Sequence, residues 1–326
     1  MGPAVKRVLL TDSIAADGEA LLRSRAEVIK APDADPATIR RLAHDVDGVI
    51  TRSKLPDDLI AVAPRLRAIV VHGTGTDLAP LADATARGVM VANLPGGNAQ
   101  SVAEYCAMAM LMLARNVLAI TTALRGQPWD AVRLLGTGAH EIAGMTVGIV
   151  GVGEIGKRLA LSCRRGFGMK VLGNQRRMDR LPPEAEAADL HELISKSDFV
   201  VVTCPLTPQT LHLFNRERLA LMKHTAWLIN VGRGAVVQEE ALIEALREKR
   251  IAGAMLDVYE HYRLPPGHPL LALDNVLLTP HLAGMTVESR SRMSVAAAEE
   301  MLRMLDGERP KNLVNPEALH ARPAHH

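Results

Sequence analysis

The fold of this chain is decided by Thr146-Val-Gly-Ile-Val-Gly-Val-Gly-Glu-Ile-Gly156. An apolar, strand-like run leads straight into three glycines spaced G-x-G-x-x-G, and a helical pattern follows. The glycines allow a tight turn, a close approach of pyrophosphate to the backbone, and close packing of helix on strand. The stretch predicts a βα unit that holds a dinucleotide at a helix N-terminus. The expected contacts are Gly151, Gly153, Glu154, Ile155 and Gly156, and the alternative is a glycine-rich turn without a ligand.

Short apolar runs alternate with helical patterns on both sides of this unit. Most of the runs are continuous Val, Ile and Leu, as expected for strands covered on both faces. Such alternation gives a parallel sheet with right-handed crossovers. The expected strands are residues 8–11, 48–51, 68–72, 89–92, 146–150, 170–173, 199–203, 227–231, 253–258 and 276–279.

Two longer helical patterns frame the series that starts at Thr146. The first covers residues 100–114, and its Ser101-x-x-Glu104 fits a capping box. The second covers residues 287–305 and ends before Gly307, a plausible cap. The chain therefore leaves a first domain, builds a second and returns.

We predict an α/β protein of two doubly wound parallel-sheet domains. A Rossmann cofactor domain, residues 100–286, is inserted into a flavodoxin-like substrate domain, residues 1–99 and 287–326.

Composition restricts the class of partner. The 326 residues carry a formal net charge of +2, which argues against nucleic acid or a membrane surface as the main partner. Three widely spaced cysteines without a C-x-x-C pattern indicate neither a disulfide framework nor a metal site, and favour the cytoplasm. No apolar run reaches the length of a membrane span.

The position that selects between two cofactors comes shortly after the second strand of the βα unit. Gln175 stands where an acid would bind the ribose 2′-hydroxyl of NAD and repel the 2′-phosphate of NADP. Arg176 and Arg177 offer forked donors that suit a phosphate. We therefore expect NADP(H). NAD(H) is the alternative, if both arginines are solvated and Asp179 turns to the ribose.

Further motifs follow one another along nearly the whole chain. They are His72-Gly-Thr-Gly-Thr-Asp77, Asn93-Leu-Pro-Gly-Gly-Asn98, Cys204-Pro-Leu-Thr207, Ile229-Asn-Val-Gly-Arg-Gly234, Leu256-Asp-Val258 and Pro280-His-Leu-Ala-Gly284. With these motifs the chain resembles the D-2-hydroxyacid dehydrogenases, the group of phosphoglycerate, glyoxylate and hydroxypyruvate reductases. The resemblance implies the discontinuous two-domain fold and a homodimer built through the helix near Gln100 and the segment after it.

The resemblance also implies roles for individual residues. A 2-keto acid accepts hydride from the nicotinamide, and its carbonyl oxygen then needs a proton. His281 resembles the family's general acid/base, and Arg233 resembles the arginine that binds the substrate carboxylate and polarises the carbonyl. Asp257 would fix the nicotinamide amide, with turn capping as the alternative. Further implied contacts are Cys204, Pro205, Val231 and Gly284 for the cofactor, and Gly73, Thr74 and Gly75 for the substrate carboxylate.

One position departs from the family pattern. The family usually continues Asp-Val-aromatic with Glu-x-Glu-Pro, and the second Glu pairs with the catalytic His. Here Tyr262 stands at that Glu, while the flanking residues keep their spacing. We expect Tyr262 to hydrogen-bond His281 without adding charge. Glu260, two residues earlier, is the alternative partner.

The substrate is less well specified. Arg52 and Lys54 follow the strand at residues 48–51 and, with His72, could accept a second anionic group, or they are ordinary surface charges. The favoured function is an NADP-dependent reductase of small 2-keto acids such as glyoxylate or hydroxypyruvate. The alternatives are a phosphoglycerate-dehydrogenase-like enzyme and a non-catalytic cofactor-binding sensor.

Overall fold

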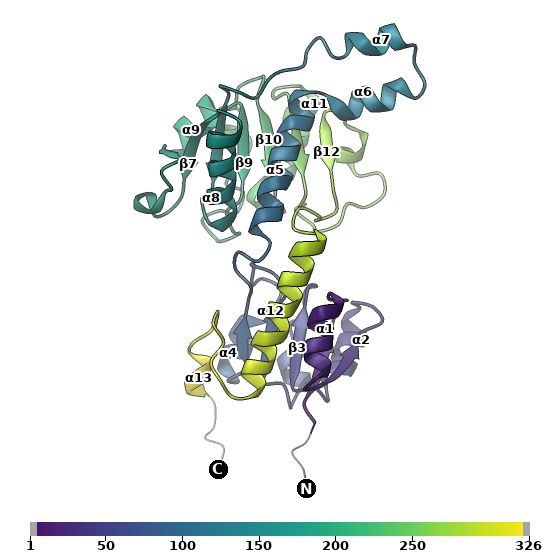
Figure 1. Ribbon diagram of the computed structural model, residues 1–326, viewed down its shortest axis with the longest axis vertical. Coiled ribbons are helices and arrows are strands. Elements are labelled where there is room, and N and C mark those ends of the chain that lie inside the picture. Colours follow the sequence, from purple (N-terminus) through teal and green to yellow (C-terminus); the bar gives the residue numbers. More distant parts are fainter. Residues whose placement is uncertain (1–4, 322–326) are drawn as a thin grey trace. The chain divides into compact units, whose positions relative to one another are not determined.

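The computed structural model describes residues 5–321, and the chain forms two compact units (Figure 1). One unit contains the residues up to Asn98 together with those from Met285 onward. The other is the continuous segment Ala99–Gly284. We call them the outer unit and the inserted unit.

The outer unit is built on a five-stranded parallel sheet. Its strand order is β2-β1-β3-β4-β5, which is the flavodoxin-like order. The strands are β1 (Arg7–Leu10), β2 (Glu27–Lys30), β3 (Gly48–Thr51), β4 (Ala68–Val71) and β5 (Met90–Ala92). The helices are α1 (Ala16–Arg23), α2 (Pro36–Ala43), α3 (Leu59–Val62), α4 (Leu81–Ala86), α12 (Val287–Leu305) and α13 (Ala318–Ala321).

The inserted unit carries a seven-stranded parallel sheet of order β12-β11-β10-β9-β6-β7-β8. Read from β8, this is the Rossmann order with one strand added. The strands are β6 (Thr146–Val150), β7 (Lys170–Asn174), β8 (Glu186–Ala187), β9 (Phe199–Val202), β10 (Trp227–Asn230), β11 (Gly253–Leu256) and β12 (Val276–Leu278). The α-helices are α5 (Ala99–Ala114), α6 (Val117–Leu124), α7 (Trp129–Leu134), α8 (Glu154–Leu161), α9 (Leu190–Lys196), α10 (Arg216–Leu219) and α11 (Glu239–Arg247). Short turns of other helix types are Ser162–Gly166, Met178–Arg180, Gly234–Val236 and Pro269–Ala272.

The predicted fold class is confirmed, and each predicted strand is present with its ends shifted by at most two residues. The strands β2 and β8 were missed. Both lie at sheet edges and are partly or wholly exposed, so neither shows the continuous apolar run of a buried strand.

The predicted capping box is wrong. Helix α5 begins at Ala99, so Ser101 lies inside its first turn instead of preceding it. Glu104 accepts a hydrogen bond from the side chain of Gln100 at 2.8 Å. By contrast, Gly307 does cap α12. It has a left-handed φ of 84°, and the amides of Gly307 and Glu308 close the last turn onto Met304 and Arg303.

The segment after α12 returns to the outer sheet beside β5. The amide of Val314 donates to the carbonyl of Val91 at 2.8 Å, and the side chain of buried Asn315 pairs with the amide of Val91 and the carbonyl of Val89. These bonds satisfy the backbone of the β5 edge.

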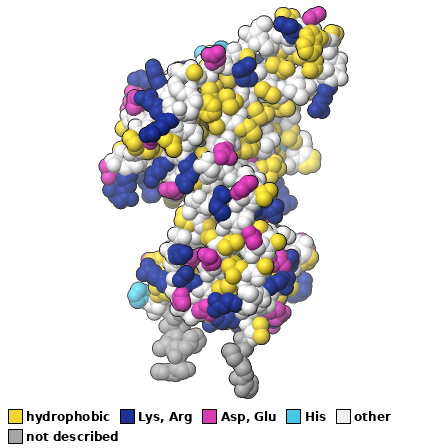
Figure 2. All heavy atoms as spheres, viewed as in Figure 1, with side chains coloured by type: hydrophobic (Ala, Val, Ile, Leu, Met, Phe, Trp, Pro, Cys, Tyr) yellow, Lys and Arg dark blue, Asp and Glu magenta, His cyan; other side chains and the backbone are white. Residues whose placement is uncertain are grey.

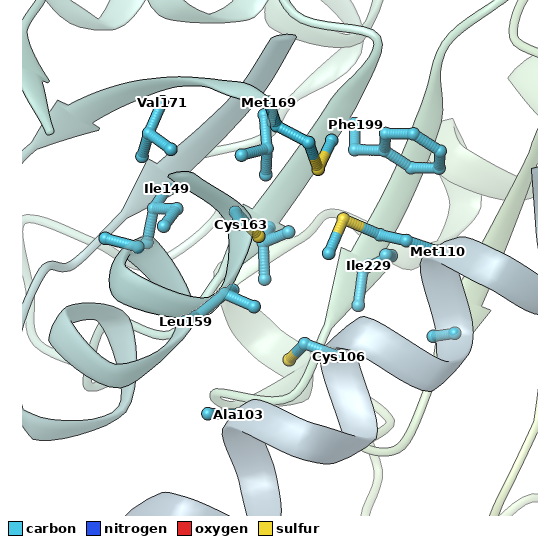
Figure 3. Packing of buried hydrophobic residues seen from close by; sticks show 14 of the residues in the cluster. Ala103, Cys106, Met110, Ile149, Leu159, Cys163, Met169, Val171, Phe199 and Ile229 are labelled. Atoms are coloured by element: carbon cyan, nitrogen blue, oxygen red, sulfur yellow. The ribbon is translucent and has the colours of Figure 1, made fainter. Parts of the chain in front are cut away.

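Helix α5 supplies much of one core of the inserted unit. Figure 3 shows Cys106 and Met110 of α5 directed toward Cys163, Leu159 and Ile229. Small side chains on the buried side of α5, such as Ala103 and Ala109, bring the helix close to its neighbours. This core packing holds α5 against α8 and the sheet. It thereby positions the side chains of α5 that contact the loops at the strand ends.

The segment that follows α5 has a different character. Helices α6 and α7 extend from the sheet, and Figure 2 shows apolar side chains over α5 and around α7. Exposed apolar side chains on α5 and on this segment, which we call the arm, are Met108, Leu111, Val117, Leu118, Leu124, Trp129, Leu134 and Leu135. Within residues 5–321, no single helix has the length and hydropathy to cross a membrane, although α5 and α6, bent by 60°, meet that criterion as a pair.

Candidate active site

The glycine turn opens a cavity at the carboxyl ends of β6, β7 and β9. The cavity has a volume of about 510 Å³. Gly151 has φ 98°, and a Cβ there would lie 2.6 Å from the backbone of Cys204, so only glycine lets these two loops meet. Of the predicted cofactor contacts, Gly151, Gly153, Gln175, Arg176, Arg177, Cys204 and Pro205 line the cavity.

The space around Gly153 indicates whether a dinucleotide fits the cavity. Its φ is −82°, and a Cβ built on it would meet nothing within 4 Å. The protein itself therefore leaves room for a side chain at this position, which forms the N-cap of α8. A glycine there is explained by a group that must approach the backbone at a helix N-terminus, as a pyrophosphate does.

Glu154 pairs with basic side chains of its own helix. Its carboxylate is bound by Arg158 at 3.0 Å and by Lys157 at 3.5 Å, and the pairing with Arg158 lowers the pKa of the carboxyl group. The unfavourable charge next to the pyrophosphate position is thus neutralised within α8. Glu154, Ile155, Gly156, Val231, Asp257 and Gly284 are predicted contacts that do not line the cavity.

The stretch after β7 is basic. Arg177 makes a two-point ion pair with Asp179 at 3.0 and 2.8 Å, and the side chain of Gln175 donates to the carbonyl of Arg177 at 2.7 Å. Arg176 and Arg180 have no acid partner among residues 5–321. Sequence reasoning missed Lys157, Asn174 and Arg180 as cavity residues. The spacing of Arg180 after Arg177, one turn of a short helix, was the available signal.

The loop that carries His281 is held by Asp257 at the end of β11. One carboxylate oxygen accepts from the Thr279 hydroxyl at 2.6 Å and the Leu282 amide at 2.7 Å, and the other accepts from the Ala283 amide at 2.9 Å. The carbonyl of Asp257 accepts from the amide of His281 at 2.9 Å. His281 has a left-handed φ of 58°, a costly conformation for a non-glycine residue, and these bonds offset that cost. Asp257 therefore caps this turn, and its contact with a nicotinamide amide stays a prediction.

Two tyrosines hold the same loop at Thr279. The hydroxyls of Tyr105, from α5, and of Thr279 lie 2.6 Å apart, and the hydroxyl of Tyr259 donates to the carbonyl of Thr279 at 2.8 Å. Burial raises the pKa of Tyr259 to about 12, with the Asp257 charge adding to the effect. Burial also raises the pKa of Tyr105. Both hydroxyls therefore stay protonated and act as donors at neutral pH.

Tyr262 meets His281 through ring contact. The ring centroids lie 6.3 Å apart at an interplanar angle of 74°, and the Tyr262 hydroxyl has no hydrogen-bond partner among residues 5–321. The expected hydrogen bond to His281 is thus replaced by an edge-to-face contact. Tyr262 itself has a left-handed φ of 63°.

Glu260 is engaged elsewhere. Its carboxylate pairs with the ring of His212 at 2.7 Å and accepts from the amide of Glu239 at 3.2 Å. His268 contacts Glu239 at 3.2 Å. These bonds anchor the loop before Tyr262 to the turn after Arg233, and they leave Glu260 poorly placed to replace the usual partner of His281.

Arg233 follows β10 and is half-buried. Its guanidinium donates to the carbonyl of Gly232 at 3.0 Å, and the side chain of Asn230 holds the Arg233 carbonyl at 3.1 Å. The carboxyl ends of β10, β11 and β12 thus bring Arg233, Asp257 and His281 to one edge of the inserted sheet.

The predicted substrate residues lie at the equivalent edge of the outer sheet. Arg52 and His72 follow the neighbouring strands β3 and β4, joined by the bond from the His72 amide to the Thr51 carbonyl at 2.8 Å. Burial, with Arg52 as the next cause, lowers the pKa of His72 to about 4. His72 is therefore neutral at pH 7 and adds no charge. Its Nε2 lies 3.0 Å from the Ser294 hydroxyl.

Other charges at this edge separate into two groups. Lys54 pairs with Asp57 at 3.1 Å and is exposed. Arg52 has no acid partner among the described residues, and neither does Arg290, which acts electrostatically on His72 and was missed by sequence reasoning. Arg290 lies one turn before Ser294 on α12, and this helical spacing was the only signal. The amide of Gly73 donates to Val71, whereas those of Thr74 and Gly75 have no described acceptor.

Comparison with known proteins decides the family. The family model of the D-isomer-specific 2-hydroxyacid dehydrogenase NAD-binding domain matches residues 107–283. The chain belongs to this family. Its members are NAD(P)-dependent oxidoreductases, and this chain is one of them.

Individual D-2-hydroxyacid dehydrogenases match over most of the chain. A glyoxylate reductase of Thermofilum pendens is 39% identical over 97% of this chain and 96% of its own length. A D-3-phosphoglycerate dehydrogenase of Methanocaldococcus jannaschii is 35% identical over 95% of this chain, but this covers only 59% of that protein. An NADPH-dependent glyoxylate/hydroxypyruvate reductase of Sinorhizobium meliloti, solved with NADP and malonate, superposes with a TM-score of 0.85 at 29% identity over 99% of this chain and 100% of that one.

Within residues 5–321, no cluster of three or more His, Cys, Asp or Glu side chains is arranged to hold a metal ion.

Proposed function

We propose that this dehydrogenase is an NADP(H)-preferring reductase of small 2-keto acids, of the glyoxylate or hydroxypyruvate type. The observation that carries the proposal is the basic, acid-poor edge of the cavity beside Gln175. Arg176 and Arg180 line it and have no acid partner in the described part of the chain, and Asp179 is paired with Arg177. A carboxylate that would repel a 2′-phosphate is absent from the lining residues.

The two units would then divide the work. The inserted unit, close to residues 100–286, holds the cofactor, and the outer unit, residues 1–99 and 287–326, contributes substrate contacts. The amides of Thr74 and Gly75 are suited to a carboxylate because they have no acceptor among residues 5–321.

The chemistry follows from three side chains. When bound, the nicotinamide supplies the hydride. Arg233 pairs with the substrate carboxylate and polarises the adjacent carbonyl. His281, exposed at its loop, donates a proton to the carbonyl oxygen as charge develops there. Tyr262 restrains the His281 ring by edge contact, and Asp257 holds the loop in its strained conformation.

The exposed apolar arm supports a homodimer. Several large side chains on α5, α6 and α7 are exposed together, and a surface of this kind on a protein indicates an association site. We also place the enzyme in the cytoplasm, a proposal supported by three free, buried cysteines.

The deciding experiment compares initial rates on hydroxypyruvate and glyoxylate with NADPH and with NADH. A higher kcat/KM with NADPH is the expected outcome. A preference for NADH would show that the arginines after Gln175 are surface residues. Absence of turnover with both keto acids, while cofactor still binds, would refute the proposed activity.

A second candidate is an enzyme for a keto acid with another anionic group, as in phosphoglycerate dehydrogenases. Arg52 and Arg290 favour it, because both lie near neutral His72 and have no acid partner among the described residues. Replacing Arg52 by Gln should then selectively raise the KM for the phosphorylated substrate.

A further inference from the structure

A second cavity lies beside His281 and is separate from the cavity at the glycine turn. It belongs wholly to the inserted unit and has a volume of about 560 Å³. His281, Tyr262 and Arg263 line it together with an apolar wall that includes Leu264, Leu271 and Leu278. The remaining lining residues are Tyr259, Thr279 and Pro280.

The charge in this cavity has one sign. No Asp or Glu is among its lining residues. The side chain of Arg263 has no acid partner among residues 5–321, and the hydroxyl of Tyr262 has no hydrogen-bond partner there. The nearby acids are already committed, since Glu260 is bound to His212 and both oxygens of Asp257 accept from the His281 loop.

The apolar wall and the basic side chain together indicate which kind of ligand the cavity suits. A cavity with an apolar wall, one forked cation and one free hydroxyl suits a ligand group with an apolar stem and a terminal anion. The same cavity is lined by the imidazole that would protonate the substrate carbonyl. A substrate bound to His281 would therefore have its side chain in the cavity that Arg263 and the leucines line.

We propose that this cavity is a side-chain subsite that selects 2-keto acids carrying an apolar stem of a few carbons with a distal carboxylate. The inference rests on the proposed function and extends it, because glyoxylate has no side chain to place there. Tyr262 and Arg263 stand where the family usually has Glu-Pro. Both residues line this cavity, and Tyr262 also contacts the ring of His281.

The test uses two keto acids of matched carbon number, 2-oxoglutarate and 2-oxopentanoate, in which a carboxylate replaces a methyl group. The full-length enzyme is assayed with its preferred cofactor. We expect kcat/KM for 2-oxoglutarate to exceed that for 2-oxopentanoate by roughly tenfold or more, since only 2-oxoglutarate can form a charged hydrogen bond with Arg263. In Arg263→Gln this ratio should fall to about one, mainly through KM.

Two variants serve as comparisons. Arg247→Gln removes an exposed arginine of α11 that has no ion-pair partner among the described residues, and it should keep the wild-type ratio. A ratio that collapses in Arg52→Gln but not in Arg263→Gln would place the anion in the outer unit and overturn the proposal. A wild-type ratio near one would also overturn it.

If the proposed reductase function itself is wrong, the assays give a different result. If glyoxylate, hydroxypyruvate and both probes are not reduced, the proposed function fails. Calorimetric binding of 2-oxoglutarate and 2-oxopentanoate to the cofactor-loaded protein still tests the subsite. Selective binding of 2-oxoglutarate that disappears in Arg263→Gln supports it, and equal binding of both acids contradicts it.

Discussion

Arg176 is the side chain whose replacement tests the proposed cofactor preference most directly. Its guanidinium lines the cavity at the glycine turn and has no acid partner among residues 5–321, whereas Arg177 is held by Asp179. We predict that Arg176→Ala raises the KM for NADPH by roughly three- to fivefold and changes the KM for NADH little, because an exposed charged contact contributes modestly. Arg177→Ala should have a smaller effect. Steady-state titration of both cofactors measures this, and an equal loss for NADH would exclude a 2′-phosphate contact.

Tyr262 contacts His281 through its ring. Its hydroxyl has no hydrogen-bond partner among residues 5–321, and the two rings lie edge to face. We therefore predict that Tyr262→Phe retains kcat on glyoxylate within about threefold, while Tyr262→Ala loses roughly tenfold or more through a mobile imidazole. Glyoxylate is used because it has no side chain to reach the hydroxyl. A large loss in Tyr262→Phe would restore the hydrogen-bond role expected from the sequence.

His72 links stability to pH. Its pKa is lowered to about 4 in the folded chain, from an ordinary 6.5, because burial disfavours the charged ring. The unfolded chain then binds more protons between these values, so stability is full above about pH 6.5 and decreases as pH falls toward 4. The expected contribution lost by pH 5 is about 2 kcal/mol. Urea unfolding of wild type and His72→Gln at pH 7 and pH 5 measures it, and parallel changes in both proteins would exclude it.

At the scale of elements, the His281 loop depends on α5. Tyr105 binds Thr279, Thr279 binds Asp257, and Asp257 holds the amides of Leu282 and Ala283. We predict that Tyr105→Phe lowers kcat by roughly three- to tenfold with KM for cofactor unchanged, because the loop gains freedom while the dinucleotide cavity is untouched. Hydrogen exchange of residues 279–283 should increase in parallel. Unchanged exchange with a lower kcat would contradict this coupling.

The elements also show where sequence patterns are reliable. Buried central strands such as β6 and β9 were predicted from their continuous apolar runs, since both faces of a parallel sheet are covered. The edge strands β2 and β8 lack that signal. The false capping box at Ser101 has a similar cause. A Ser-x-x-Glu pattern describes a local hydrogen-bond option, but the helix already begins at Ala99, whose side chain is buried like that of Val102.

At the scale of the whole molecule, the arm is a surface with several exposed apolar side chains. Leu118 and Trp129 are 50% and 64% exposed. We predict that the wild-type protein sediments as a dimer. Leu118→Asp should shift it toward monomer at micromolar concentration, because burying an unpaired charge in an apolar interface costs free energy. Analytical ultracentrifugation measures the state. Asp130→Asn, next to Trp129, is the matched control, and a monomeric wild type would refute the proposal.

The sequence alone determined the family, the two-sheet architecture and the chemical types at the site. Glycine spacing, buried apolar runs and ordered motifs act locally, so they can be read one segment at a time. Tertiary structure decided what those side chains do. It engaged Asp179 with Arg177 and Glu260 with His212, neutralised His72 by burial, and turned Asp257 toward the His281 loop. It also brought Arg263 and three leucines to one cavity. These outcomes depend on which residues, far apart in the sequence, share a carboxylate, a buried environment or a cavity. No local pattern contains that information.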